Sequence, residues 1–168
     1  MELEFRSATE GELETVFAIY REAIREMGQR GIEQWDEIYP DREVLAEDIR
    51  KRELFTGRAG GEIVLAYALN RECDEGYVNG KWSFPESSCL VLHRLCLSPS
   101  VWGRGIGGMA LAHIEEEVRR SGKRSIRLDA FSENPAALRM YEKRGYQNVG
   151  DLFLRKGRFF LMEKGVTG

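Results

Sequence analysis

The sequence predicts one mixed α/β (α+β) domain spanning residues 1–168, built around a glycine-rich turn that joins a strand to a helix. Strand-like apolar runs, such as Glu62–Asn70 and Cys89–Leu97, alternate with segments whose apolar residues recur at helical spacing. Gly103–Gly108 has four glycines in six residues and leads into a helix-like stretch reaching Arg120. Glycine allows close backbone approach, and a helix N-terminus offers unpaired N–H groups. We therefore expect this turn to bind an anion.

A dinucleotide-binding turn is the alternative interpretation of the same glycines. Gly103–Gly108 fits the G-x-G-x-x-G fingerprint, and Asp129 lies near the usual acidic offset of about 20 residues. However, Ser98–Trp102 separates the turn from its strand, and only 39 residues (168 − 129) follow Asp129, too few for further βαβ units. A P-loop is excluded because no Gly-Lys-Ser/Thr closes the turn. A phosphate-binding turn of another fold is favoured.

Composition excludes several classes of protein. A hydrophobic content of 42% is enough for one sizeable core, and 25 basic against 28 acidic residues give a net charge of −3, with no global attraction to nucleic acid or an anionic membrane. Met1–Arg6 does not begin a secretory signal, and Ile63–Leu69 is far shorter than a membrane span. Cys73, Cys89 and Cys96 lack metal-ligand spacing. We expect a cytoplasmic protein with no metal, no nucleic-acid partner and no membrane association; the sequence is compatible with a homodimer.

Apolar periodicity, caps and turn residues predict the remaining elements. In chain order they are a strand at Leu3–Arg6, a helix from the capping box Thr9–Glu12 to Gly28, a helix capped by Asp41, a hairpin of Leu54–Arg58 with Glu62–Asn70, strands at Cys89–Leu97 and Ser125–Phe131 around the helix that ends at Gly122, a helix opened by Asn134-Pro135 that ends at Gly145, and a final hairpin of Tyr146–Val149 with Arg158–Met162. Two polar segments interrupt this order. Gln29–Tyr39 is expected to be a substrate-side loop, and Arg71–Ser88, with a turn signal at Asn79-Gly80, is either a lid or tolerated surface.

The second half of the chain strongly resembles the GNAT superfamily of acetyl-CoA-dependent N-acetyltransferases. The family's Gln/Arg-x-x-Gly-x-Gly/Ala pyrophosphate motif falls on Trp102–Gly107, with tryptophan where glutamine or arginine is usual. Its Asn-x-x-Ala-x-x-x-Tyr-x-x-x-Gly-Phe/Tyr pattern runs from Asn134 to Tyr146. The resemblance implies a mostly antiparallel central sheet with helices on both faces and a splayed strand pair at the acetyl-CoA site.

The resemblance also implies which residues bind acetyl-CoA as co-substrate. In this family the strand before the turn bonds the pantetheine arm through its backbone, as an added strand would. The implied binding residues are Leu95, Cys96, Leu97, Trp102, Gly103, Arg104, Gly105, Ile106, Gly107, Gly108, Asn134, Ala137 and Tyr141. Some of these residues also have a purely structural explanation. Asn134, for example, is fully explained as a helix cap.

Transfer requires a neutral amine that attacks the thioester carbonyl directly. By resemblance, Tyr141 donates a proton to the departing CoA thiolate. Asp129 is a candidate general base, because ribosomal-protein alanine acetyltransferases carry glutamate five residues before the asparagine. His93 is the rival base, since its intrinsic acidity suits the role. A solvent-facing aspartate and a core histidine are the structural alternatives.

The sequence thus predicts an N-acetyltransferase that acts on a primary amine of a small molecule or peptide. Glu33 and Trp35 are expected on the acceptor side, because the acids of their loop suit a cationic amine. The alternative function is a non-catalytic acyl-CoA-binding module, acting as a sensor or a partner-binding domain.

Overall fold

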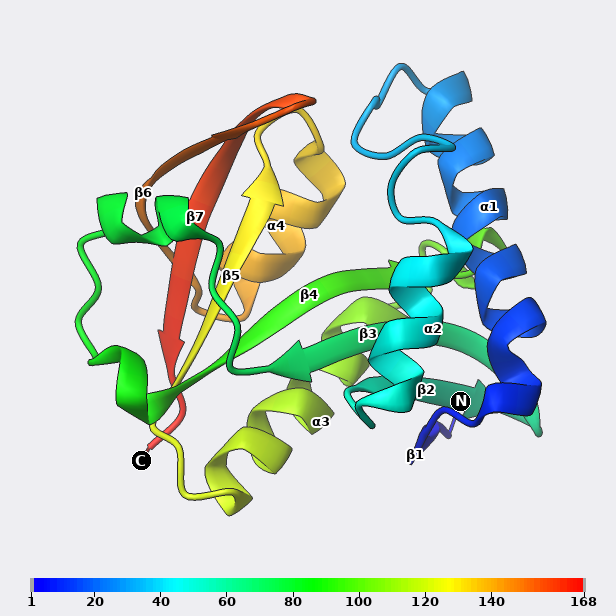
Figure 1. Ribbon diagram of the computed structural model, residues 1–168, viewed down its shortest axis with the longest axis horizontal. Helices are drawn as coiled ribbons and strands as arrows, with labels where there is room; N and C mark the ends of the chain where they lie inside the picture. The colour runs from blue at the N-terminus through cyan, green and yellow to red at the C-terminus, as the bar shows by residue number, and fades with distance from the viewer. Residues whose placement is uncertain (1, 168) are drawn as a thin grey trace. The chain divides into compact units, whose positions relative to one another are not determined.

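The computed structural model describes residues 2–167 (Figure 1). Within this range the chain forms seven strands and four α-helices, which confirms the predicted mixed α/β class. Their order is β1 (Glu4–Ser7), α1 (Leu13–Gln29), α2 (Arg42–Arg50), β2 (Leu54–Ala59), β3 (Glu62–Asn70), β4 (Cys89–Leu97), α3 (Ile106–Arg120), β5 (Ser125–Phe131), α4 (Pro135–Lys143), β6 (Gln147–Leu154) and β7 (Gly157–Gly165). Short 3₁₀ helices are η1 (Glu10–Glu12), η2 (Glu75–Asn79), η3 (Glu86–Ser88) and η4 (Pro99–Val101).

The described chain divides into two compact units. Unit 1 contains the described residues up to Leu69 together with Arg94–Ile106, and unit 2 contains Asn70–His93 and the described residues from Gly107 onward. Strand β4 contributes to both units, and the strand order along the sheet is β1-β2-β3-β4-β5-β7-β6. Organisation as one domain over residues 1–168 stays a prediction.

Unit 1 is organised by antiparallel strands with two helices. β1 pairs with β2, and β2 pairs with β3 across Gly60 (φ 59°) and Gly61 (φ 86°), the two positive-φ positions that a tight hairpin turn requires. Helices α1 and α2 lie side by side, and α2 contacts β2 (Figure 1). The buried residues that join these elements are Ala8, Val16, Ile19, Tyr20, Ala23, Leu45, Ile49, Leu54, Ala66, Ala68 and Cys96.

The helix ends of unit 1 follow local chemistry, with one correction. The predicted capping box is present, with the Glu12 carboxylate accepting the Thr9 N–H at 2.9 Å, but it opens the 3₁₀ turn η1 just before α1. Asp41 caps α2 by accepting the Val44 N–H at 3.0 Å, as predicted. The prediction that Gly28 ends α1 is wrong. The helix continues to Gln29, and Gly31 (φ 76°) takes the left-handed position instead.

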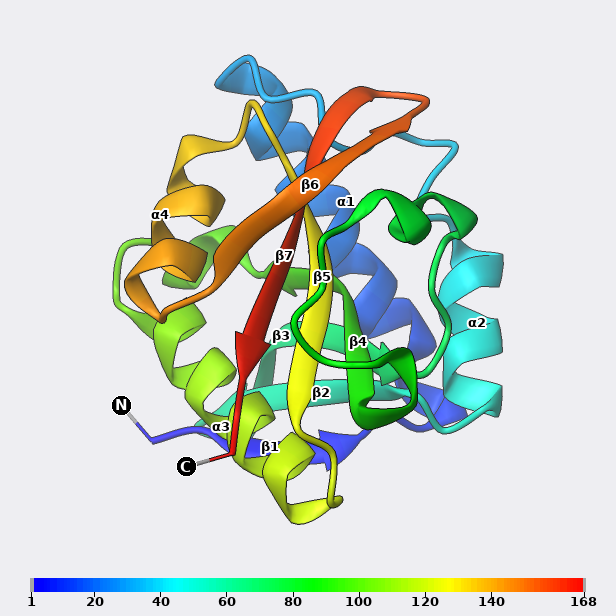
Figure 2. The same cartoon turned by 90° about the vertical axis from the view of Figure 1, so that its left-hand side faces the viewer.

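Unit 2 is centred on β5, which is buried along nearly all its length. It pairs in parallel with β4 and antiparallel with β7, and β6 pairs antiparallel with β7 (Figure 2). Helix α4 contacts β5. The predicted final hairpin exists, but both of its strands are longer than the sequence suggested because β6 continues to Leu154 and β7 to Gly165.

The pairing of β4 with β5 is short. Its register covers three residue pairs, from Cys89↔Ser125 to Val91↔Arg127, whereas β5 stays paired with β7 as far as Phe131. This short parallel register agrees with the predicted splayed strand pair.

Candidate functional site

The glycine turn is an open backbone loop in unit 1. Gly103 (φ 77°) and Gly105 (φ 74°) both adopt left-handed conformations that L-residues rarely take, and both are exposed. A Cβ added at either position would meet no atom within 4 Å. The turn leads directly into α3, a 15-residue helix whose first peptide N–H groups have no partner within the helix. This geometry suits a phosphate group, and exposed Arg104 between the two glycines adds a positive charge.

Gly107 has a different structural reason. It is buried in α3, and a Cβ there would lie 2.3 Å from the Met140 sulfur. The sequence pattern assigns Gly107 to the anion-binding turn. Because a side chain at Gly107 would have to displace the Met140 side chain of α4, Gly105, where an added Cβ meets no atom within 4 Å, is the better position for testing phosphate binding.

The side chain of Trp102 stabilises the strand before the turn. Its indole Nε1–H donates to the Leu97 carbonyl at 3.0 Å, and the Arg30 guanidinium lies 4.9 Å from its ring centroid. Trp102 therefore holds the end of β4 within unit 1, where the family motif usually has glutamine or arginine. One lone pair of the Leu97 carbonyl is used by this bond, although a carbonyl can accept a second.

Leu95 and Cys96 precede Leu97 on β4. Cys96 is buried, and burial raises the pKa of its thiol, so that the side chain stays protonated and acts as a small apolar group. The side chain of Cys96 thus belongs to the core of unit 1, as expected for a strand whose backbone would contact the ligand.

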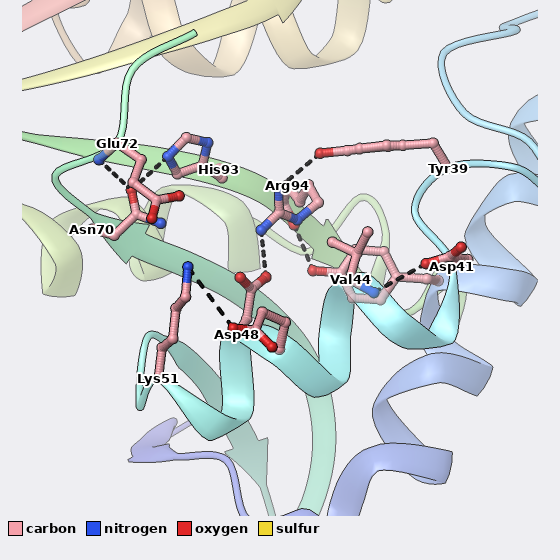
Figure 3. Close-up of polar contacts among 11 residues, drawn as sticks. Tyr39, Asp41, Val44, Asp48, Lys51, Asn70, Glu72, His93 and Arg94 are labelled. Carbon is pink, nitrogen blue, oxygen red and sulfur yellow. Dashed lines mark hydrogen bonds and ion pairs between the residues drawn. The ribbon is translucent and has the colours of Figure 1, made fainter.

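Arg94 lies within β4 and has a positive φ of 52°, which is uncommon for a residue with a side chain. Its guanidinium donates to the Tyr39 hydroxyl at 2.7 Å and forms an ion pair with Asp48 (Figure 3). Its carbonyl accepts the Tyr20 hydroxyl at 2.6 Å. These contacts hold the unusual backbone in place and tie β4 to both α1 and α2 of unit 1.

His93, the neighbouring residue, belongs to unit 2. The Asn70 side-chain oxygen accepts the Glu72 N–H at 2.9 Å and lies 2.8 Å from His93 Nε2 (Figure 3). A backbone N–H can only donate, so this Asn70 atom is the oxygen, and His93 Nε2 must carry the proton. In neutral His93 the basic lone pair is therefore on Nδ1.

Asp129 lies on β5 and accepts a hydrogen bond from the Tyr77 hydroxyl at 2.7 Å. Tyr77 is in η2, within the polar segment Arg71–Ser88, and only 3% of it is exposed. Burial, followed by the charge of Asp129, raises the pKa of Tyr77, so its phenol stays neutral. The candidate base thus has a phenol partner that the sequence interpretation did not identify. No motif marks Tyr77, which is one of three aromatic residues, with Trp82 and Phe84, in a mostly polar stretch.

Tyr141 lies on α4 in the same unit. It is 8% exposed, and its ring packs edge-on against Tyr146 with centroids 5.5 Å apart. Burial and the charge of Asp129 raise the pKa of Tyr141, so its phenol is neutral. Asn134 caps α4 by accepting the Ala137 N–H at 3.2 Å, which accounts for both residues structurally.

The segment Arg71–Ser88 is anchored within unit 2 rather than open. The Trp82 ring stacks on Tyr77 at 5.5 Å, and its Nε1–H donates to the Tyr77 carbonyl at 2.7 Å. The Arg127 guanidinium lies 4.3 Å from the Trp82 ring centroid, and Glu163 accepts the N–H groups of Ser83 and Phe84. The turn signal at Asn79-Gly80 coincides with the end of η2, where the Gly80 N–H donates to the Tyr77 carbonyl at 3.1 Å.

The expected acceptor loop belongs to unit 1. Glu33 is exposed, whereas Trp35 is partly buried and packs against Tyr20 with ring centroids 5.6 Å apart. Trp35 therefore has a packing role in addition to any contact with a substrate. The Asp36 carboxylate accepts the N–H groups of Ile38 and Tyr39, so it shapes the loop.

Among residues 2–167, no helix is both long and apolar enough to cross a membrane. The same residues contain no group of three or more His, Cys, Asp or Glu side chains arranged to hold a metal ion.

Comparisons with known proteins agree on one family. The model of the acetyltransferase (GNAT) family matches residues 16–146. Acetyltransferase Atu2258 of Agrobacterium fabrum is 32% identical over 82 residues, which make up 49% of this chain and 58% of that protein, so less than two thirds of the relative is covered.

Solved structures share the fold over nearly the whole chain. A GNAT-family acetyltransferase from Streptococcus agalactiae matches with a TM-score of 0.88 and 25% identity, covering 97% of this chain and 95% of the other. The paiA N-acetyltransferase of Thermoplasma acidophilum, solved in complex with coenzyme A, matches with a TM-score of 0.73 and 20% identity, covering 98% of this chain and 99% of the other.

Proposed function

This chain belongs to the acetyltransferase (GNAT) family, and from that premise we propose that it transfers an acetyl group from acetyl-CoA to a primary amine by direct attack in a ternary complex. The observation that carries the proposal is the glycine turn. Gly103 and Gly105 expose left-handed backbone with no side chain in the way, immediately before the N-terminus of a long helix. The pyrophosphate of acetyl-CoA is the anion that this cradle would hold. Coenzyme A is present in the Thermoplasma relative.

The chemistry assigns opposite proton roles to two residues of unit 2. As the amine nitrogen forms its bond to the acetyl carbon and the carbon–sulfur bond breaks, Asp129 accepts the proton that leaves the nitrogen. Tyr141 donates its proton to the thiolate sulfur and is reprotonated from solvent. Burial keeps this phenol neutral before the reaction, so its proton is present to be donated. His93, through Nδ1, is the alternative base.

The acceptor is proposed to be a small-molecule or peptide amine that is cationic in solution. Glu33 supplies an exposed carboxylate in the acceptor loop, and Trp35 supplies an aromatic surface beside it. An acid near the acceptor would attract the ammonium form of the amine.

A panel of amines tests the function, with release of free CoA thiol as the readout and mass spectrometry to identify the product. Turnover with at least one amine, giving a product heavier by one acetyl group, is expected. Tight acetyl-CoA binding without turnover of any amine would instead favour the non-catalytic acyl-CoA-binding module.

The phosphate cradle is tested by a matched pair of variants. Gly105 (φ 74°) and Gly122 (φ 86°) both adopt left-handed backbone, and an added Cβ meets nothing within 4 Å at either position. Gly105→Ala and Gly122→Ala should therefore cost similar stability, but only Gly105→Ala should weaken acetyl-CoA binding in calorimetry. Equal affinity of both variants for acetyl-CoA would remove the turn from the site.

A further inference from the structure

We propose that Tyr77 is a positioning residue for acetyl transfer: by donating its hydroxyl to Asp129, it holds that carboxylate ionised and oriented to accept the proton of the amine. This inference rests on the proposed function and on Asp129 as the base. The hydrogen bond is 2.7 Å long and joins residues 52 positions apart in the chain. The family motifs do not cover the segment Arg71–Ser88, and this hydrogen bond gives that segment a role at the site.

The Tyr77 ring, which carries the hydroxyl, is buried and held by Trp82. Only 3% of the residue is exposed, and Trp82 both stacks on the ring and donates to the Tyr77 carbonyl. Trp82 is in turn covered by the guanidinium of Arg127, whose Nη2 donates to the Phe84 carbonyl at 2.9 Å. A phenol fixed in this way loses little freedom on bonding to Asp129, so the bond can orient the carboxylate.

The groups around Asp129 explain why a neutral donor matters. Tyr77 approaches from η2 and Tyr141 lies on α4, and both phenols have raised pKa values because of burial and the charge of Asp129. Leu161 of β7 is opposite Asp129 in the sheet register and brings no charge. Cys89 and His93 are the titratable residues of β4 in this unit, and Asp74 and Cys73 act on Tyr77 from its own segment.

A hydrogen bond donated to a carboxylate stabilises its charged form and lowers its pKa. Removing the donor therefore raises the pKa of Asp129, which is then protonated at pH values where the parent carboxylate is ionised. Because a protonated carboxyl cannot serve as the base, the acidic limb of the kcat/KM profile should shift to higher pH.

The test is Tyr77→Phe, which keeps the ring and its stacking on Trp82. The matched control is Tyr146→Phe, because Tyr146 is also 3% exposed and donates its hydroxyl to a carboxylate, Glu115, at 3.0 Å. We expect the acidic limb of Tyr77→Phe to move up by about one pH unit, a roughly tenfold loss of kcat/KM on the acidic side. The acidic limb of the kcat/KM profile should lie at the same pH in Tyr146→Phe as in the parent protein.

A second readout needs no substrate. The ¹³C resonance of the Asp129 carboxyl, assigned with Asp129→Asn, reports its titration in the free protein, and its midpoint should rise in Tyr77→Phe but not in Tyr146→Phe. If the midpoint of the Asp129 titration is unchanged in Tyr77→Phe, the inference is overturned. It is also overturned if that midpoint rises but the acidic limb of the kcat/KM profile does not move. A failure of the proposed function gives a different result: no amine releases CoA, although the midpoint of the Asp129 titration still rises in Tyr77→Phe. That result would also remove the role of Tyr77 in catalysis.

Discussion

The carboxylates of Glu115 and Asp129 both lie in unit 2, but Glu115 is bonded to two cations, whereas a buried phenol is among the donors to Asp129. Glu115 accepts hydrogen bonds from Arg144 (2.5 Å), Lys164 (2.9 Å) and Tyr146 (3.0 Å). Although burial alone would raise the pKa of Glu115, the hydrogen bonds from the two cations lower it. Asp129 accepts a hydrogen bond from the neutral phenol of Tyr77, and its charge raises the pKa of a second phenol, Tyr141.

The difference separates a structural carboxylate from a candidate catalytic one. A carboxylate bonded to two cations is held ionised far below neutral pH, so it joins α3 to α4 and β7 but cannot exchange protons usefully. The phenol of Tyr77, unlike the two cations at Glu115, is not left as an unpaired charge when its carboxylate partner gains a proton.

The largest expected effect is on stability, at Glu115. Glu115→Ala leaves Arg144 and Lys164 without their shared partner, and we expect it to lower the free energy of unfolding by about 5 kcal/mol, measured by urea denaturation. Glu116→Ala on the same helix is the control, because its partners Arg119 and Arg120 are exposed and the loss should stay below about 1 kcal/mol. Equal losses would show that the Glu115 network contributes no more than a surface pair.

The pH dependence of this loss has a definite sign. The folded-state pKa of Glu115 is depressed below its ordinary value of 4.5, so its stabilising contribution is present above that pH and is lost as the pH falls through the folded value. The stability difference between the parent and Glu115→Ala should therefore shrink below pH 4.5. A difference that grows under acid would contradict the lowered pKa.

Asp129→Asn should have the opposite pattern, with little loss of stability and a large loss of activity. Asparagine can still accept the Tyr77 hydroxyl, but it cannot take a proton. We expect kcat/KM to fall about a thousandfold at moderate pH and to recover as rising pH supplies neutral amine. If Asp129→Asn leaves kcat/KM unchanged and His93→Gln removes the acidic limb of the kcat/KM profile, the base is His93.

Tyr141→Phe removes the proposed donor and should lower kcat by about a hundredfold across the pH range, with acetyl-CoA affinity nearly unchanged. No pH-dependent recovery is expected, because burial raises the pKa of Tyr141 and the parent phenol is neutral throughout. Single-turnover kinetics is the appropriate measurement, since product release could otherwise hide the effect. A folded variant with parental single-turnover rates would exclude Tyr141 as the donor.

The smallest effect is expected at Glu33, an exposed carboxylate that lies apart from the sites of Glu115 and Asp129, in the acceptor loop of unit 1. Glu33→Ala should raise the acceptor KM by up to about fivefold and leave that of acetyl-CoA unchanged, as for a single screened surface charge. Glu62→Ala, at an exposed position in the β2–β3 hairpin, is the control. A rise in the acetyl-CoA KM alone would refute the acceptor assignment.

Features that depend on neighbouring residues were predictable from the sequence. The caps by Asp41 and Asn134, the Gly60-Gly61 turn and the left-handed glycines at 103 and 105 all follow from local backbone chemistry. Gly28 and Gly31 show the limit of this reasoning, because both stand near the end of α1 and only the folded chain determines which one adopts positive φ.

Contacts between distant segments were not predictable in the same way. The bond from Tyr77 to Asp129 spans 52 residues, and its donor comes from a polar segment without periodicity. Gly107 was assigned to the turn because its motif position fits, whereas the space for a side chain there is limited by Met140 of α4, which the local sequence does not reveal. Arg94 likewise has no sequence signal. Its positive φ is stabilised by contacts with Tyr20 of α1, Asp48 of α2 and Tyr39 of the loop between these helices.

The indole of Trp102 gives the protein a built-in fluorescent reporter. The chain has three tryptophans, and Trp35 and Trp82 are held against tyrosine rings in separate clusters. Trp102 is the one that stands at the first residue of the glycine turn, beneath the Arg30 guanidinium and bonded to Leu97. An anion that attracts Arg30 or alters the turn changes the surroundings of this indole, so a change in emission on adding CoA that disappears in Trp102→Phe would give a dissociation constant without any knowledge of the amine.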